Sequence, residues 1–144
     1  MIHSMKAVID TGPLVALFDS SDKYFKAAVE FIRNSEFQLY ATVPVITETL
    51  FLLDFNINAQ TNFLSWIYSG AMEISELKQD DMKRISLLMK KYHDLPMDFA
   101  DASVVLACEK IGTTNVATLD RDFEIYRCSD KSRFINIFQR GIPR

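Results

Sequence analysis

Short apolar runs alternate with segments of helical periodicity along this chain. The runs lie at about residues 6–10, 37–42, 115–118 and 134–138, and a further run at 71–75 is either a short strand or an extended link. Strands joined through helices pair in parallel, because each connection has to cross back over the sheet. The pattern therefore predicts an α/β fold with a mostly parallel sheet of four or five strands and helices on both of its faces.

The segments between the runs carry apolar residues at helical spacing. Gly12 and Pro13 indicate a turn after the first run, followed by a short helical turn. Pro44 suits the first turn of a helix, and Gly112 suits a helix end. We expect the short helical turn at 14–18 and helices at 24–35, 44–54, 59–68, 80–92 and 97–110.

The composition is that of a soluble globular protein, with 49% hydrophobic and 24% charged residues. No stretch approaches the ~20 consecutive apolar residues that a membrane span needs, so we expect no membrane association. The N-terminus lacks a secretory signal, and the two cysteines, Cys108 and Cys128, are too few for a disulfide framework. We expect a cytoplasmic protein in which residues 1–144 form a single domain, with residues 1–4 an alternative start or a tag remnant.

Acidic residues follow the predicted strands. Asp10 ends the first run, and Asp120 comes directly after the run at 115–118. Glu48 lies about one turn inside the helix that follows the second run. Because the carboxyl ends of parallel strands meet at one edge of a sheet, we expect these three side chains to share a pocket.

Further acids belong to the same neighbourhood. Asp98 and Asp101 are three residues apart near the start of a predicted helix, so they lie on one face of it. Asp122 follows Asp120 closely. Asp98, Asp120 and Asp122 each have a second interpretation as helix caps. Asp101, like Glu48, sits among apolar residues, where an unpaired charge is costly, and this favours a functional role.

A cluster of acids needs compensation. Ionised carboxylates about 4 Å apart repel each other by roughly 1 to 4 kcal/mol per pair. Protonation, basic partners or cations relieve this repulsion, and Arg121 is the main basic residue near these motifs. Oxygen ligands without a histidine or cysteine cluster favour Mg²⁺ or Mn²⁺ over zinc. One or two such ions can activate water and polarise a phosphodiester, so the acids predict a metal-dependent nuclease.

Hydroxyl and basic side chains complete the set of candidates. Thr11 and Thr118 stand beside acids and are candidates to hold a ligating carboxylate, although such hydroxyls also bond the backbone. Residues 121–144 carry 6 basic and 3 acidic side chains, against 10 and 16 in residues 1–120. Arg121 and Arg127 are therefore candidates for contacts with RNA phosphates, with a solvated charged surface as the alternative.

Four motifs occur in order: 8–17 (VIDTGPLVAL), 47–49 (TET), 98–103 (DFADAS) and 116–123 (VATLDRDF). With this spacing the chain resembles the PIN domain family, particularly the VapC-like toxin ribonucleases of bacterial and archaeal toxin–antitoxin systems. The resemblance implies a three-layer α/β/α sandwich, Mg²⁺- or Mn²⁺-dependent cleavage of RNA, a homodimer and an antitoxin partner.

The resemblance also assigns roles to residues. Asp10, Glu48, Asp101 and Asp120 look like the acidic quartet of the family, with Asp98 and Asp122 as auxiliary acids in similar motifs. Asp120 and Asp122 both suit the fourth position, and Asp120 is preferred because it is nearer the strand end.

Other functions compete with this reading. An RNA-processing nuclease without an antitoxin and an inactive PIN-fold binding module are the main alternatives. Asp10-Thr11-Gly12 also spells the triplet of aspartic proteases, but those enzymes are all-β and the helical periods argue against them. The apolar segments 51–55 and 63–68 are candidates for a dimer or antitoxin surface, with burial in the core as the alternative.

Overall fold

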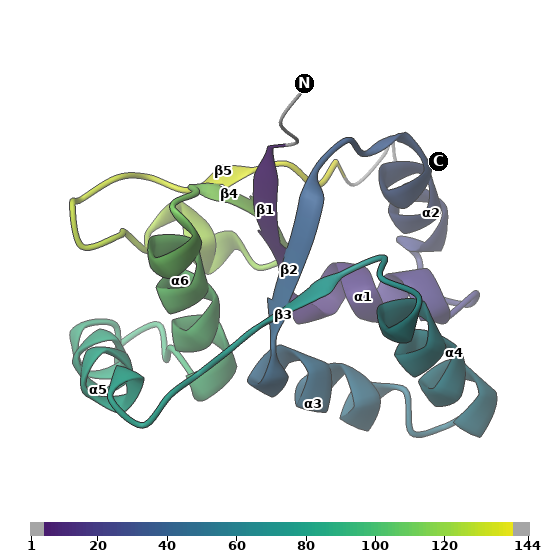
Figure 1. Ribbon diagram of the computed structural model, residues 1–144, viewed down its shortest axis with the longest axis horizontal. Coiled ribbons are helices and arrows are strands. Elements are labelled where there is room, and N and C mark those ends of the chain that lie inside the picture. Colours follow the sequence, from purple (N-terminus) through teal and green to yellow (C-terminus); the bar gives the residue numbers. More distant parts are fainter. Residues whose placement is uncertain (1–4, 140–144) are drawn as a thin grey trace.

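The computed structural model of the chain describes residues 5–139, so the expectations for residues 1–4 and for the basic residues Arg140 and Arg144 lie outside it. Its centre is a parallel sheet of five strands in the order β3-β2-β1-β4-β5 (Figure 1). The strands are β1 (Lys6–Ile9), β2 (Gln38–Thr42), β3 (Glu73–Ser75), β4 (Asn115–Ala117) and β5 (Ile135–Asn136). The predicted parallel sheet is confirmed, and the run at 71–75 contains a strand.

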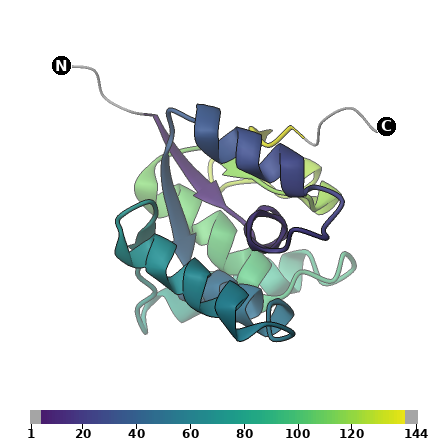
Figure 2. The same cartoon turned by 90° about the vertical axis from the view of Figure 1, so that its right-hand side faces the viewer.

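Helices cover both faces of the sheet. They are α1 (Thr11–Phe18), α2 (Phe25–Asn34), α3 (Val43–Leu52), α4 (Ile57–Tyr68), α5 (Asp81–Lys91) and α6 (Phe99–Ile111), with a 3-10 helix η1 (Arg121–Glu124). Helix α6 packs on β1 and β2, and α5 packs outside α6. Helices α1, α2 and α4 lie on the other side, and Figure 2 looks along α1 with α2 and α4 beside it. The expected α/β/α sandwich is confirmed.

The central strands are apolar because both of their faces are covered. In β1, Ala7 and Val8 are completely buried and Ile9 nearly so, and in β4 Val116 and Ala117 are completely buried. The first strand of the chain is therefore the middle of the core.

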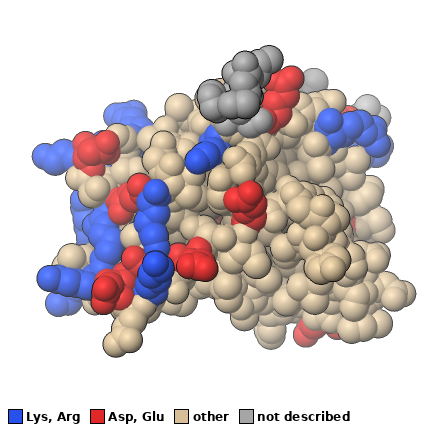
Figure 3. Space-filling view, viewed as in Figure 1, with Lys and Arg blue, Asp and Glu red and all other residues tan. Residues whose placement is uncertain are grey.

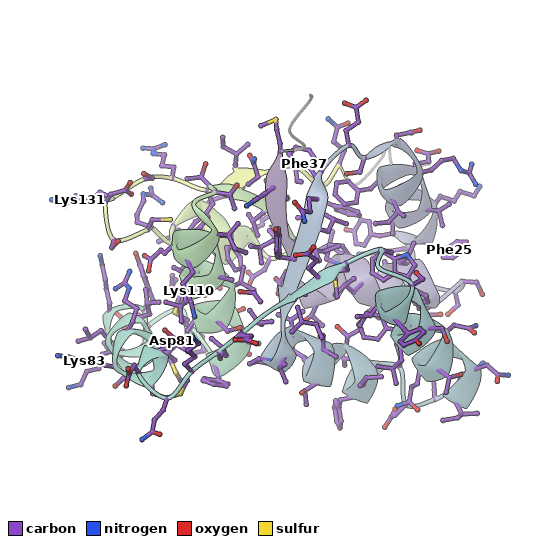
Figure 4. All side chains as sticks on the ribbon, viewed as in Figure 1. Phe25, Phe37, Asp81, Lys83, Lys110 and Lys131 are labelled. Carbon is purple, nitrogen blue, oxygen red and sulfur yellow. The ribbon has the colours of Figure 1, made fainter. Side chains whose placement is uncertain are left out.

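Two ion pairs fasten the outer layer of helices. Lys110 of α6 contacts Asp81 of α5 over 2.8 Å (Figure 4), and the guanidinium of Arg84 makes two hydrogen bonds to the carboxylate of Glu109, of 3.0 and 2.7 Å. Figure 3 shows many of the charged side chains gathered over this side of the molecule. Within residues 5–139, no helix is long and apolar enough to cross a bilayer.

Helix α1 begins earlier than the sequence predicts. The expected turn through Gly12 and Pro13 is wrong, because the helix starts at Thr11 directly after Asp10. Pro13 fits in the first helical turn, where its missing N–H leaves no hydrogen bond unmade. A Cβ on Gly12 would lie 3.1 Å from both Cβ and Cδ1 of Leu119. Glycine therefore lets the start of α1 approach the segment that follows β4.

Side-chain caps set other helix ends. Oδ1 of Asn56 accepts hydrogen bonds from the backbone N–H groups of Asn58 and Ala59, so α4 starts at Ile57, two residues before its predicted start. Gly112 ends α6 with a φ of 82°, a left-handed conformation that suits glycine. The predicted end of that helix is confirmed.

Candidate active site

An open pocket of about 510 Å³ lies at the carboxyl ends of the central strands. Of the described side chains that line it, six are acidic: Asp10, Asp22, Glu48, Asp98, Asp101 and Asp120. Five of these are acids singled out in the sequence, and they come from four places along the chain: the end of β1, α3, the start of α6 and the segment after β4. The parallel sheet therefore brings the predicted acids together, as the strand-end argument requires.

Asp10 and Thr118 lie at the ends of two neighbouring strands. The hydroxyl of Thr118 donates a hydrogen bond to Oδ2 of Asp10 over 2.8 Å and accepts one from the backbone N–H of Asp120 over 2.9 Å. The N–H of Asp10 donates to the carbonyl of Ala117 over 2.9 Å, which extends the pairing of β1 with β4. Thr118 thus connects two of the acids through one buried oxygen.

The carboxyl group of Asp10 is buried, with 6% of the residue exposed. Burial raises its pKa from 3.8 to about 6, and the negative charges of Asp120 and Glu48 add to this rise. Hydrogen bonds from the Thr11 backbone and the Thr118 hydroxyl lower the pKa, but they do not cancel the effect of burial. An ionised Asp10 is therefore costly unless a positive charge comes close to it.

Asp98 and Asp101 form a capping box at the start of α6. The carboxylate of Asp98 accepts a hydrogen bond from the N–H of Asp101 over 2.8 Å, and the carboxylate of Asp101 accepts one from the N–H of Asp98 over 3.2 Å. Burial raises the pKa of Asp101 well above its usual range, and the charges of Asp98 and Asp10 raise it further. Both residues therefore cap helix α6 and also line the pocket.

Asp120 likewise both caps a helix and lines the pocket. It is the N-cap of η1, where its side chain accepts a hydrogen bond from the N–H of Asp122 over 2.9 Å, and it lines the pocket. Burial raises the pKa of its carboxyl group, with the charges of Asp122 and Asp98 adding to the effect. Asp122 is not among the residues that line the pocket. The structure thus brings Asp120, rather than Asp122, together with the other acids.

Glu48 reaches the pocket from α3, the helix that follows β2 without a loop. Thr42, the last residue of β2, is the N-cap of this helix, and its hydroxyl accepts a hydrogen bond from the N–H of Val45. The same hydroxyl lies 2.6 Å from that of Ser103 on α6, which in turn donates to the carbonyl of Ala100. This buried pair of hydroxyls connects the two helices that carry Glu48 and Asp101.

Thr11 differs from Thr118. Its hydroxyl oxygen is buried, and within residues 5–139 it has no hydrogen-bond partner. Thr11 lines the acidic pocket. A buried hydroxyl without a partner costs free energy, so this one is suited to a ligand or water in the pocket.

Among the pocket residues that were not predicted candidates, three have polar side chains. Asp22, Lys23 and Tyr24 belong to the connection between α1 and α2, which borders the acids. The connection follows no strand, so the strand-end argument could not find it. The one signal available was the closeness of residues 19–24 to the first motif in the sequence.

The two arginines predicted to contact RNA have different surroundings. Arg121 is exposed and lines a small neighbouring pocket that also includes Asp120. Arg127 is half-buried, and its Nη1 donates hydrogen bonds of 2.8 Å to the carbonyls of Glu124, Ile125 and Tyr126. Arg121 is therefore exposed to solvent near the acids, whereas Arg127 is hydrogen-bonded to backbone carbonyls at the end of η1 and just after it.

The acids fit a hard divalent cation by the kind of donor they offer. Carboxylate oxygens suit Mg²⁺ and Mn²⁺, and the buried Asp10 and the unpartnered Thr11 hydroxyl both call for a polar ligand. Within residues 5–139, no three or more histidine, cysteine, aspartate or glutamate side chains are arranged so that they could hold a metal ion. The chemistry of the donors around the pocket is therefore what supports a metal ion here.

Comparison with known proteins identifies a family and a curated relative. The family model described as PIN domain matches residues 7–127. Ribonuclease VapC26 of Mycobacterium tuberculosis (strain ATCC 25618 / H37Rv) is 28% identical over 116 residues, which cover 79% of this chain and 86% of that protein. The family match extends over all four sequence motifs.

Solved structures share the fold at lower identity. A crystal structure of VapC20 of Mycobacterium tuberculosis, described as a Sarcin-Ricin loop cleaving toxin, superposes with a TM-score of 0.76 at 18% identity, covering 83% of this chain and 94% of that one. The structure of PAE2754 from Pyrobaculum aerophilum superposes with a TM-score of 0.60 at 18% identity, covering 93% and 90%. At such identities the likeness concerns the fold alone, and it agrees with the parallel sandwich described above.

Proposed function

Because this chain belongs to the PIN domain family, we propose that it is a metal-dependent endoribonuclease and the toxin of a VapBC-type toxin–antitoxin pair. The observation that carries the proposal is the gathering of Asp10, Glu48, Asp98, Asp101 and Asp120 around one pocket at the carboxyl edge of the sheet. The similarity to a ribonuclease supports RNA as the substrate class.

Mg²⁺ or Mn²⁺ is the cofactor that suits these donors. Asp10, Glu48, Asp101 and Asp120 would hold the ion, with Asp98 and Asp122 as auxiliary acids. When bound, such an ion supplies a Lewis acid for the phosphodiester and an activated water.

The chain's own residues prepare the pocket for this chemistry. Thr118 donates to one oxygen of Asp10 and accepts from the backbone N–H of Asp120, so it holds the carboxylate of Asp10 next to the backbone of Asp120. The capping box holds Asp98 and Asp101 at the start of a buried helix. The free hydroxyl of Thr11 can accept or donate a hydrogen bond to water or substrate in the pocket.

The partner face is proposed to lie on α3 and α4. Exposed apolar side chains gather there, and Figure 3 shows a mostly uncharged surface over these helices. They include Phe51 (69% exposed), Phe55 (61%), Ile57 (66%) and Tyr68 (94%). An apolar surface of this kind suits a second copy of the chain or an antitoxin.

The two free cysteines support a cytoplasmic setting.

Two other functions stay open. An RNA-processing nuclease would use the same pocket without an antitoxin, whereas an inactive binding module would have lost one or more acids. All four principal acids are present in this chain, so catalysis is the better supported function.

The test is cleavage of a mixed pool of structured and single-stranded RNAs by the purified protein, with Mg²⁺, with Mn²⁺ and with EDTA. We expect cutting with either metal, none with EDTA, and none with an Asp10→Asn variant that is shown to be folded. Cutting that persists in EDTA or in the variant would contradict the proposal. If no RNA in the pool were cut, a binding module would become the better explanation.

A further inference from the structure

The acidic pocket has one basic side chain at its rim. Six carboxylates line it, and among the described residues around it Lys23 is the only lysine or arginine. A polyanion such as RNA is repelled by this concentration of negative charge, and bound cations offset only part of it. A positive group at the rim is therefore well placed to attract a phosphate.

The segment that carries Lys23 is held in place by its own turns. The carboxylate of Asp19 accepts hydrogen bonds from the backbone N–H and the hydroxyl of Ser21, and the carboxylate of Asp22 accepts one from the N–H of Tyr24 over 2.8 Å. The carbonyl of Asp22 accepts a hydrogen bond from the N–H of Phe25, the first residue of α2. Figure 4 labels Phe25 at the edge of the molecule. These bonds connect the backbone of Lys23 to the start of α2.

The side chain of Lys23 is supported by an aromatic ring. Its Nζ lies over the ring of Tyr24, 5.0 Å from the centroid, which is a cation–π arrangement. The ring of Tyr24 is half-buried and packs against the core. Lys23 itself is exposed, and the ion pairs among residues 5–139 do not include it. Its ammonium group is therefore available to a ligand and is kept near the pocket.

We propose that Lys23 binds a phosphate of the RNA next to the cleaved bond and that Tyr24 positions its ammonium group. This inference rests on the proposed ribonuclease function and adds a substrate contact to it. The acids provide the site of reaction, and Lys23 provides attraction for the strand at the same opening.

A matched lysine provides the control. Lys26 lies three residues further on, in α2, and is exposed, but it does not line the pocket. Lys23→Gln and Lys26→Gln change the net charge equally, so a difference between them reports on position rather than on overall charge. Lys23→Arg restores the charge, Tyr24→Phe keeps an aromatic ring, and Tyr24→Leu removes it.

Binding should be measured separately from cleavage. All variants are made in an Asp10→Asn background with Mg²⁺, and fluorescence anisotropy of a labelled pool of RNA hairpins and single strands is recorded over a salt series. We expect Lys23→Gln to weaken binding roughly two- to five-fold, which lies within the range for one exposed charge pair. The slope of log K against log salt should decrease by about 0.7, the value for one phosphate on a single strand.

The other variants complete the pattern. Lys26→Gln should leave the dissociation constant and the salt slope unchanged, and Lys23→Arg should have the wild-type values of both. The dissociation constant of Tyr24→Phe should be closer to that of wild type than the dissociation constant of Tyr24→Leu.

In the otherwise wild-type enzyme, Lys23→Gln should raise KM while kcat changes little. Equal effects of Lys23→Gln and Lys26→Gln, or no RNA binding at all, would overturn the inference. A specific loss of binding in a protein that cuts no RNA would instead refute the nuclease and keep Lys23 as an RNA contact.

Discussion

The hydroxyl of Thr118 donates a hydrogen bond of 2.8 Å to Oδ2 of Asp10, and both residues are buried. They follow β4 and β1, which are neighbours in the sheet although they lie at opposite ends of the chain. Since the same hydroxyl accepts from the backbone N–H of Asp120, one small side chain connects the carboxylate of Asp10 to the backbone of Asp120. A threonine hydroxyl can do this because it donates one hydrogen bond and accepts others.

Thr118→Val should test this arrangement, because valine keeps the shape and removes the hydroxyl. Loss of the donor should raise the pKa of Asp10 further, since the Thr118 hydrogen bond lowers it. We expect metal affinity or cleavage to fall about 10- to 100-fold, as for other residues that orient ligands. The measurement is the pH dependence of kcat/KM, which should shift to higher pH. Thr118→Ser should behave nearly as wild type, and an unshifted profile in the valine variant would count against the role.

Asp101→Asn should abolish cleavage while the fold is kept. The amide oxygen can still accept the hydrogen bond from the N–H of Asp98, so the capping box is retained. Because burial and nearby charges raise the pKa of Asp101, the neutral variant should have a higher Tm than wild type in metal-free buffer at neutral pH. Cleavage assays and thermal unfolding in EDTA test both statements. Normal cleavage by the variant would remove Asp101 from the set of essential acids.

Stability without metal should depend on pH through Asp10. Its pKa is raised from 3.8 to about 6, so the unfolded state ionises at lower pH than the folded state. The free energy of unfolding should therefore be highest below pH 3.8, fall as the pH rises toward 6, and level off above it, a loss of about 3 kcal/mol for this group. Urea unfolding in EDTA from pH 4 to 8 measures this. The difference in the free energy of unfolding between wild type and Asp10→Asn should grow as the pH rises from 4 toward 6. A difference that stays constant would refute the raised pKa of Asp10.

Gly12→Ala should destabilise the protein, although alanine is usually the better helix former. The new methyl would lie 3.1 Å from Cβ of Leu119, and the backbone of Leu119 adjoins Asp120. Overpacking of this kind costs about 1 to 3 kcal/mol. Chemical unfolding gives the stability, and cleavage assays report any displacement of Asp120. The double variant Gly12→Ala/Leu119→Ala should recover part of the loss, and stabilisation by Gly12→Ala alone would show that the two segments can separate easily.

Arg121 and Arg127 should respond differently to substitution. Arg121→Gln should weaken RNA binding and reduce its salt dependence, because this side chain is exposed beside Asp120. Arg127→Gln should mainly lower stability, by about 1 kcal/mol, because Nη1 is bonded to three carbonyls. Anisotropy titrations and thermal unfolding separate the two effects. An unchanged salt slope in Arg121→Gln would leave that residue as part of the solvated surface.

Much of the fold follows from local patterns in the sequence. The apolar runs contain the strands, of which β1, β2 and β4 are mostly buried, and their separation by helices predicts parallel pairing. The gathering of Asp10, Glu48 and Asp120 could be predicted for the same reason, since Asp10 and Asp120 follow strands and Glu48 lies in the helix after β2. Asp101 joins them from the first turn of α6. Capping by Asp98 and Asp120 was an open alternative, and in the structure both residues cap and also line the pocket.

The remainder depends on contacts between distant segments. The sequence made Thr118 a candidate to hold a carboxylate, but it could not show that this carboxylate is the one of Asp10, because the bond requires β4 to lie beside β1. Likewise, the start of α1 at Thr11 depends on how closely Gly12 approaches Leu119. Lys23 lies between two helices, and only the packing of α1 brings its segment to the pocket.

The strand order has a consequence for biosynthesis. β1 is made first, yet it occupies the middle of the sheet, and one of its two neighbours, β4, is made after most of the chain. Translation delivers the N-terminal segments first, so Asp10 emerges long before Thr118 and Asp120 can meet it. We expect chains truncated before β4 to show no cleavage. For most of the chain's own synthesis, the pocket therefore lacks the carboxylate of Asp120 and the hydroxyl that holds Asp10.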